Sequence, residues 1–496
     1  VAPEPRADSL GTLYRGGSSL VRQKVLTTAG DSPEVISNDE LVSTIERQDT
    51  LAAQATLLIG NRRAPGIAPM LRRLLDHSEP AQQAAAAVAL RALRADDERV
   101  AESRLRELLA SDDPAERVAA LDAARHEPEI VPDVLVASLS GDSSEARLAA
   151  LRVVDASPKR SLLPAVVQTL GDPETRVAAR RTLRAFSEED TLYDLNRSFR
   201  RPQATRNLRV GVVRAIRDTG SQASMRSILG LLDRQDLTGR VESEIVDALL
   251  DLARATMAPS DTDRRVAEHI RRIASRAYWS YAAEALIVGD SAACKLLRDH
   301  YHQRARTDVR TLLTLCVIAR PNTPIETIAY HVDTQGEGLA DSLEVLDNVA
   351  PRDARELVTP LAEARSLHDR VAAGRALGLD LPGEVHEALL PLIASSSTWL
   401  AIVALSCADA AVLERVDWDS TTISRADADD LPGYTARYAE SLTGKPSPHG
   451  DQRMYSELEK TAYLKSSDTF RDICGEEVFY VAQIAEEQHL ADGESL

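Results

Sequence analysis

The stretch that decides the fold is DPAERVAAL at residues 113–121, which returns in altered form as DPETRVAA at residues 172–179. In both copies an Asp-Pro pair comes directly before a run rich in small and apolar residues. Asp at a helix N-cap accepts a hydrogen bond from an unpaired backbone N–H, and Pro at the first helical position gives up no needed donor. Each stretch therefore predicts the beginning of a helix.

Two more helix starts fall on the same period. Glu79-Pro80 and Ser143-Ser144 open similar Ala- and Leu-rich segments, so the four starts follow at steps of 34, 30 and 29 residues. This period fits one helix pair per repeat, and in a stack of repeats each unit packs only against its neighbours. We therefore predict an all-α solenoid of antiparallel helix pairs from about residue 39 to 445, right-handed and with almost no β-structure.

Composition favours the same architecture and excludes some partners. Aromatic residues make up 4% of the 496 residues, which is little for a large globular core. A net charge of −18 disfavours nucleic acid and anionic lipid as main partners. The longest apolar window, residues 389–413, is broken by Ser395 to Ser397 and by Asp409. It is too interrupted for a membrane span, and we expect two buried helices there.

One position recurs three residues after each Pro or Ser that begins a repeat helix. It holds Gln83 in the first repeat and then Arg117, Arg147 and Arg176. The arginines either line a ridge that grips a phosphate or acidic partner, or each reaches an acidic residue of the adjacent repeat. Equivalent positions in a stack give the second geometry automatically, so we predict an inter-repeat ladder. The residues assigned to this structural role are Asp113, Pro114, Arg117, Arg147, Asp172, Pro173 and Arg176.

No catalytic, cofactor or metal site is predicted. The chain has no Gly-x-x-x-x-Gly-Lys loop and no Gly-x-Gly-x-x-Gly motif after a strand. His300 and His302 are two residues apart, so on a helix they point to different faces, and we expect an exposed or capping polar stretch. The acidic clusters at 188–190 and 427–430 stand beside no His or Cys and are interpreted as solvated loops or helix starts. The four cysteines show no paired spacing and fit a reducing cytosol.

The recurring helix starts resemble those of a known repeat family. The segments at 113–121 and 172–179 resemble the short bacterial HEAT repeat, in which a helix opens with an Asp-Pro-Glu-x-Arg pattern, over about residues 39 to 255. Longer helices are predicted at 264–287, 291–318, 338–348 and 351–360. With them, the region resembles the cytosolic HEAT region of bacterial proteins that join an ATP/ADP-translocase-like or major-facilitator membrane domain to a cyclic-nucleotide-binding domain.

The last part of the chain resembles the helical lead-in of such a cyclic-nucleotide-binding domain. The resemblance covers residues 455–487. Phe470 corresponds to the Phe of a Leu-x-x-x-x-x-Phe element on the family's short helix, and the family's first β-strand would begin near His489. The family's phosphate-binding cassette lies further on, in the β-roll, so the resemblance implies that this chain does not bind cyclic nucleotide. The lead-in helices are expected to be loosely held, because the apolar faces around Leu464, Phe470, Val478 and Ile484 lack that roll.

These observations give a predicted organisation. Residues 1–37 form a leader or linker with one possible short helix at 17–28. Residues 38–255 form HEAT repeats, 256–445 divergent helical repeats, and 446–496 a linker and the start of a cyclic-nucleotide-binding-like domain. Because the first residue is not Met and the sequence stops abruptly, we expect an internal piece of a longer protein.

The predicted function is a non-enzymatic regulatory or scaffolding module for protein-protein or interdomain interaction. It would act in the cytoplasm, and the resemblance implies the cytosolic face of the inner membrane. The alternative is a HEAT-repeat enzyme or enzyme accessory, similar to a phycobilin lyase or a DNA-alkylation glycosylase. The first would need a partner subunit, and the second a basic groove with aromatic side chains, which the charge of −18 disfavours.

Overall fold

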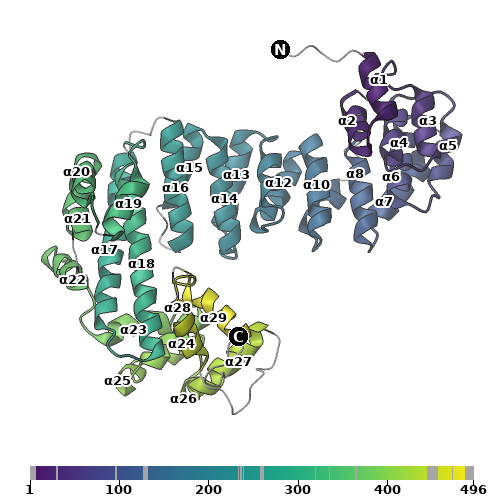
Figure 1. Cartoon of the computed structure of the whole chain (residues 1–496). Helices are drawn as coiled ribbons and strands as arrows, with labels where there is room; N and C mark the ends of the chain where they lie inside the picture. Colours follow the sequence, from purple (N-terminus) through teal and green to yellow (C-terminus); the bar gives the residue numbers. More distant parts are fainter. Residues whose placement is uncertain are drawn as a thin grey trace, which may run out of the picture. The chain divides into compact units, whose positions relative to one another are not determined.

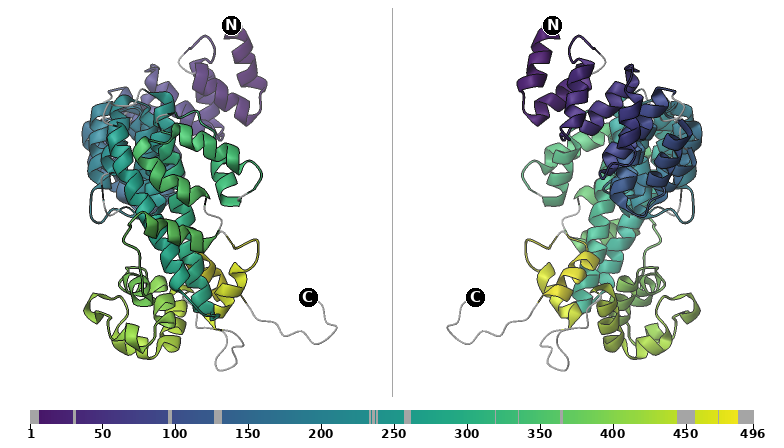
Figure 2. Two further views of the ribbon diagram at one scale, coloured as in Figure 1. Left: turned by 90° about the vertical axis from the view of Figure 1, so that its left-hand side faces the viewer. Right: turned by 90° about the vertical axis from the view of Figure 1, so that its right-hand side faces the viewer.

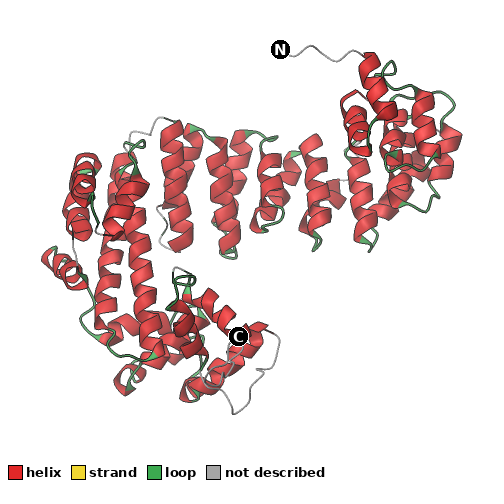
Figure 3. Cartoon of the chain, viewed as in Figure 1, coloured by secondary structure: helices red, strands yellow, loops and turns green. Residues whose placement is uncertain are grey.

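A computed structural model of the whole chain describes residues 7–29, 32–94, 98–126, 132–232, 234, 237, 239–256, 262–318, 320–334, 336–363, 366–443, 456–471 and 473–485. All regular elements in these ranges are helical and none is a strand (Figures 1 and 3). The all-α prediction is confirmed. The chain divides into two compact units, Val1–Gly220 and Ser221–Leu496.

The first unit contains fourteen α-helices among its described residues. They are α1 (Ala7–Gly16), α2 (Ser19–Ala29), α3 (Asn38–Glu46), α4 (Ala52–Asn61), α5 (Ala68–Leu74), α6 (Pro80–Ala92), α7 (Glu98–Leu109), α8 (Pro114–Ala124), α9 (Pro132–Ser140), α10 (Ser144–Ala156), α11 (Leu163–Gln168), α12 (Arg176–Leu183), α13 (Glu188–Phe199) and α14 (Arg206–Thr219). From α4 to α14 every second helix packs against the next, so the even-numbered helices form one continuous row.

Small residues let this row pack closely. On α6 the whole run from Ala84 to Leu90 is buried. On α4, a Cβ added to Gly60 would lie 2.4 Å from the Cβ of Ala89, so only glycine fits there without a shift of one helix. Helix contact through Ala and Gly thus takes the place of large aromatic side chains in the core.

Three of the four predicted helix starts are confirmed. Helices α6, α8 and α10 begin at Pro80, Pro114 and Ser144. The fourth helix, α12, begins at Arg176, three residues later than predicted. The reason is a turn over residues 172–175, in which the buried Thr175 hydroxyl donates to the carbonyl of Thr169 at 2.8 Å and ends the turn before the helix begins.

The segment at 1–37, predicted to be a leader or linker with one possible helix at 17–28, contains two helices. Its residues 7–29 form α1 and α2, which pack against each other. The hydroxyl of Tyr14 lies 2.9 Å from that of Thr44, and Arg22 forms a 2.5 Å ion pair with Asp49. Because these contacts reach α3 and the loop after it, residues 7–29 belong to the first unit, despite their high Gly and Ser content.

The second unit contains the remaining helices. They are α15 (Gln222–Leu232), α16 (Gly239–Ala255), α17 (Thr262–Leu286), α18 (Ala292–Cys316), α19 (Ile325–Thr334), α20 (Leu339–Val349), α21 (Arg352–Glu363), α22 (Leu367–Ala376), α23 (Val385–Ile393), α24 (Thr398–Cys407), α25 (Ala410–Leu413), α26 (Arg425–Asp429), α27 (Leu431–Thr443), α28 (Glu457–Lys465) and α29 (Gly475–Ile484). The 25-residue helices α17 and α18 lie side by side at its centre (Figures 1 and 2).

Most of the later helices match their predicted ranges. Helices α17, α18, α20 and α21 correspond to the four predicted segments, and the Ser291 side chain caps α18 through the backbone N–H of Cys294. The apolar window at 389–413 is divided between α23, α24 and α25, with Ser397 and Asp409 as N-caps. Helices α15 and α16 belong to the second compact unit, because α15 packs on α16 and α16 packs on α18.

The last two helices are packed more firmly than predicted. Val478 and Phe479 of α29 are fully buried, and the Phe479 ring lies 4.6 Å from the Trp399 ring of α24. Lys465 of α28 forms a 2.9 Å ion pair with Asp299 of α18. The expectation of loosely held helices is therefore wrong for the Val478 side of α29, although Ile484 is exposed. The strand predicted near His489 lies outside the described residues.

Candidate binding groove

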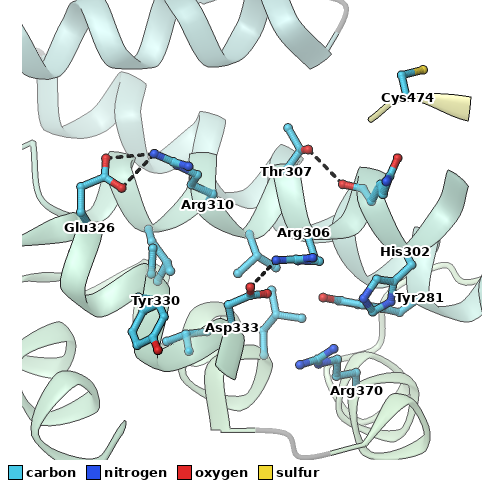
Figure 4. Close-up of a pocket in the computed structure, with 16 residues that line it drawn as sticks. Tyr281, His302, Arg306, Thr307, Arg310, Glu326, Tyr330, Asp333, Arg370 and Cys474 are labelled. Atoms are coloured by element: carbon cyan, nitrogen blue, oxygen red, sulfur yellow. Dashed lines mark hydrogen bonds and ion pairs between the residues drawn. The ribbon is translucent and has the colours of Figure 1, made fainter. Parts of the chain in front are cut away.

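A groove of about 790 Å³ runs along α18 in the second unit (Figure 4). Helix α18 contributes residues from His302 to Leu313, which at about 1.5 Å per residue corresponds to about 16 Å of helix. The other walls come from α17, α19, α21, α22 and the residue before α29. The lining residues are Tyr281, His302, Gln303, Arg306, Thr307, Val309, Arg310, Leu313, Glu326, Ala329, Tyr330, Val332, Asp333, Leu361, Arg370 and Cys474.

Two ion pairs join α18 to α19 across the groove. Arg306 and Arg310 are one helical turn apart and face the same side. Arg306 pairs with Asp333, and Nη2 of Arg310 lies 2.8 and 3.0 Å from the two carboxylate oxygens of Glu326 (Figure 4). The side chains are 42% and 41% exposed in the first pair and 65% and 76% in the second. Pairs this exposed contribute about 0.2–1 kcal/mol each, so a ligand can replace either carboxylate at low cost.

One end of the groove brings together Tyr281, His302, Arg306 and Arg370 (Figure 4). The guanidinium carbon of Arg370 lies 4.6 Å from the centroid of the Tyr281 ring, a cation–π contact between α22 and α17. The Nε of Arg370 is buried and has no hydrogen-bond partner. His302 packs edge-on against Tyr281, with ring centroids 6.4 Å apart, and its Nδ1 lies 3.2 Å from a carboxylate oxygen of Glu284. Burial raises the pKa of Tyr281, so its hydroxyl stays protonated at neutral pH.

A buried ionic cluster holds the opposite face of α18. Glu242 of α16 is almost completely buried and receives hydrogen bonds from His269, Arg272 and Arg276 of α17. Arg276 also donates from Nε to Asp308 of α18 at 2.8 Å. Burial alone would raise the pKa of Glu242, but the hydrogen bonds from His269 and Arg276 outweigh it and lower that pKa to about 2. Glu242 and Arg276 are therefore both charged at neutral pH.

Breaking the buried cluster costs more free energy than opening the exposed ion pairs of the groove. Removing one member of a buried charged pair typically costs about 3–5 kcal/mol, several times the cost of opening an exposed pair. Asp308 lies between Arg306 and Arg310 in sequence but on the other side of the helix. The cluster thus fixes α16, α17 and α18 as a rigid wall, while the ion pairs on the groove side remain exchangeable.

The seven residues predicted to define the repeats all lie in the first unit, and none lines the groove. Their arginines share one contact: Arg117 Nη1 donates to the carbonyl of Ser111 at 2.5 Å, and Arg176 Nε to that of Leu170 at 3.0 Å. Arg147 makes the same contact with Gly141, as Gln83 does with His77. Each side chain thus reaches the carbonyl six residues earlier and fixes the loop before its own helix.

Arg147 also forms an ion pair with the next repeat, the contact that was predicted for each of the three arginines. Its Nη2 lies 2.8 Å from the carboxylate of Asp172, which begins the turn of the next repeat. Asp113 caps α8 by accepting from the backbone N–H of Ala115 at 2.9 Å. The contact shared by the arginines is therefore local to each repeat, and the ion pair at Arg147 adds a link between repeats.

The two histidines do point to different faces. His302 lines the groove, whereas His300 lines a separate cavity of about 70 Å³ between α18 and α24. The expectation of an exposed stretch is wrong for His300, because its Nε2 is buried and burial lowers its pKa to about 4.

The acidic clusters are helix starts, as predicted. Ser187 caps α13 by accepting from the backbone N–H of Asp190 at 3.3 Å, and Ser424 caps α26 by accepting from that of Asp427 at 3.2 Å.

The groove was not predicted from the sequence. Its signal was present as Arg306 and Arg310 four residues apart, followed by Glu326 and Asp333 seven apart on the next helix. Such spacings occur on many solvated helices. Only the packing of α19 against α18 shows that these four residues belong to one site.

Comparison of the chain with protein-family models, with curated proteins and with solved structures yields no match. Within the described ranges, no group of three or more His, Cys, Asp or Glu side chains is placed to hold a metal ion. The same ranges contain no helix that is long and apolar enough to cross a membrane.

Proposed function

We propose that the chain is a HEAT-type helical-repeat module that binds a segment of a protein partner in the groove along α18. It acts as a regulatory or scaffolding element and not as an enzyme. The observation that carries this proposal is the groove itself. It has a volume of about 790 Å³, and about three turns of α18 line its length. Its length suits roughly five residues of extended peptide at about 3.3 Å each, or a short helix, better than a compact metabolite.

The side chains of the groove support binding of protein. Arg and Tyr are enriched at protein interfaces and often carry much of the binding energy. Here three arginines line the groove together with Tyr281 and Tyr330, and the lining also includes apolar side chains such as Val309 and Leu361. Tyr330 is 65% exposed, so its ring is available to a partner.

The repeat architecture supports the HEAT assignment. Each even-numbered helix of the first unit packs on the next, and the Asp-Pro starts and the shared arginine contact recur along the row. The partner segment would come from another protein or from another domain of the same polypeptide. The resemblance adds a transporter-like membrane domain and a cyclic-nucleotide sensor as candidate neighbours, at the cytosolic face of the inner membrane.

Site-specific photo-crosslinking in the cells that make the protein tests this proposal. A photoreactive phenylalanine replaces Tyr330 in the groove or, as the control, Tyr193 of α13, which is similarly exposed at 62%. We expect position 330 to give a discrete crosslinked protein product that position 193 does not give. Absence of any product from position 330, or the same products in equal yield from both positions, would overturn the groove as the binding site.

A further inference from the structure

Arg370 differs from the other two arginines of the groove. Arg306 is paired with Asp333 and Arg310 with Glu326, but Arg370 forms no ion pair with any residue that the structure describes. Its Nε is buried without a hydrogen-bond partner. A guanidinium carries five N–H donors, and leaving a buried donor unsatisfied is unfavourable. This end of the groove therefore holds a cation that lacks an acceptor.

The surroundings hold this guanidinium in place. Tyr281, on which it stacks at 4.6 Å, is buried in α17, and α17 is tied to α16 and α18 by the cluster around Glu242. An arginine fixed in this way loses little side-chain freedom when it binds a ligand. The Arg370 fork is thus preorganised for an incoming acceptor.

The neighbouring groups can complete a site for an oxyanion. Figure 4 shows the Tyr281 hydroxyl directed towards Arg306 and Asp333, beside His302. Two carboxylates face this end, but Asp333 is already held by Arg306 and Glu284 is hydrogen-bonded by His302. Because the Arg306 and Asp333 side chains are both about 40% exposed, an incoming anion can share Arg306 at low cost. Arg370, Arg306 and Tyr281 would then donate to the same group.

We propose that this end of the groove, formed by Arg370, Arg306, His302 and Tyr281, is a subsite for the carboxylate of an acidic residue in the partner segment. The inference rests on the proposed function, in that the groove holds a peptide. Planar carboxylates match the guanidinium fork with two parallel hydrogen bonds. The rest of the groove continues along α18 towards Tyr330, which gives room for the peptide that extends from the anchored residue, whereas a free anion would use only this end.

Fluorescence anisotropy tests the subsite. The probes are a labelled octapeptide of alternating Glu and Leu and its matched Gln and Leu counterpart, with inorganic phosphate as competitor. The proteins are the full chain, Arg370→Gln, Arg370→Lys, and the control Arg375→Gln, which removes an exposed arginine of the same helix outside the groove. A charge-assisted bidentate contact changes Kd by about tenfold or more.

We expect the acidic peptide to bind the full chain at least about tenfold more tightly than the neutral peptide. Arg370→Gln should abolish that preference, Arg370→Lys should reduce it, and Arg375→Gln should preserve it. Because Arg370 packs on Tyr281, its replacement can also destabilise the fold, so the melting temperature of each variant is measured. If Arg370→Gln does not fold, Arg370→Lys, which keeps the charge, provides the test.

The outcomes separate this inference from the proposed function. Equal binding of both peptides, or an acidic preference that survives in both Arg370 variants, overturns the subsite and leaves peptide binding standing. Failure of both peptides up to about 1 mM overturns peptide binding and the subsite together. Phosphate binding that Arg370→Gln abolishes, without binding of either peptide, would show that the anion is a free one and would overturn the acidic peptide as its source.

Discussion

Arg147 of α10 links two repeats through one side chain. Its Nη1 donates to the carbonyl of Gly141 in the loop before α10, and its Nη2 lies 2.8 Å from the carboxylate of Asp172 in the turn before α12. The first contact is shared with Arg117 and Arg176, whereas the second joins neighbouring repeats. Asp172 is also held within its own turn, because it accepts from the backbone N–H of Glu174 at 3.0 Å.

Arg147→Ala should therefore destabilise the protein more than Arg117→Ala. Loss of the carbonyl contact alone should cost on the order of 1 kcal/mol, because a hydrogen bond from a charged donor to a partly exposed carbonyl contributes about that much. Loss of the additional pair with the half-buried Asp172 should raise the cost of Arg147→Ala to roughly 2 kcal/mol. Urea denaturation of both variants checks this, and an equal loss for the two would contradict the link between repeats. Loss of partner binding with an unchanged melting temperature would instead support a binding role for these arginines.

Two glycine substitutions should change stability in opposite directions. In Gly60→Ala the new Cβ would lie 2.4 Å from the Cβ of Ala89, so α4 and α6 must move apart, at a cost of about 1–3 kcal/mol. In Gly230→Ala, on α15, nothing lies within 4 Å of the new atom, and Ala in a helix interior should stabilise by about 0.5–1 kcal/mol. Thermal unfolding measures both. A stabilising Gly60→Ala would refute close packing of the even-numbered helices.

The fold was predictable where short-range chemistry decides the structure. The Asp-Pro and Ser-Ser starts at 113 and 143, and the Ser291 cap of α18, act within three residues of the helix that they begin. The start at 172 was mispredicted because Thr175, buried among neighbours, redirects the turn. Burial of this kind depends on packing that a local pattern does not contain.

The groove was not predictable for a related reason. Its walls come from helices between residues 281 and 370, together with Cys474. Arg370 has no charged neighbour at helical spacing that would mark it as unusual, since its importance comes from stacking on Tyr281, 89 positions away. Likewise, the helix that carries Phe479 was expected to be loosely held. Phe479 packs on Trp399 of α24, and a contact between residues so far apart in the sequence leaves no local pattern from which it could be predicted.

Cyclic nucleotides should not bind this chain. The resemblance at residues 455–487 is to a helical lead-in, and the phosphate cassette of the resembled family belongs to a β-roll, whereas α28 and α29 are helices packed on α18 and α24. Calorimetric titration of the chain with cyclic AMP and cyclic GMP should give only heats of dilution. Saturable binding in the micromolar range would reveal a nucleotide site elsewhere in the chain and contradict this prediction.

Acid should weaken the protein through Glu242. The pKa of this carboxyl falls from its ordinary 4.5 to about 2 in the folded state, because hydrogen bonds from His269 and Arg276 outweigh the effect of burial. The unfolded chain therefore takes up the proton first. The stability that the carboxylate contributes is complete well above pH 4.5 and is lost as the pH falls towards 2, with a total of roughly 3 kcal/mol.

Glu242→Gln isolates this contribution. At pH 6 the variant should unfold several kcal/mol more easily than the wild type, because it leaves Arg272 without a buried counter-charge and leaves Arg276 with Asp308 alone. The difference should shrink as the pH falls from about 5 to 2 and below, because the wild-type carboxyl then becomes protonated as well. Glu356→Gln, at an exposed position of α21, is the matched control and should differ little from the wild type at any pH. Urea denaturation across this pH range makes the measurement. A difference between Glu242→Gln and the wild type that stays constant with pH would show that the carboxylate is not held ionised by its partners, and the buried cluster would then not explain the rigidity of the wall behind the groove.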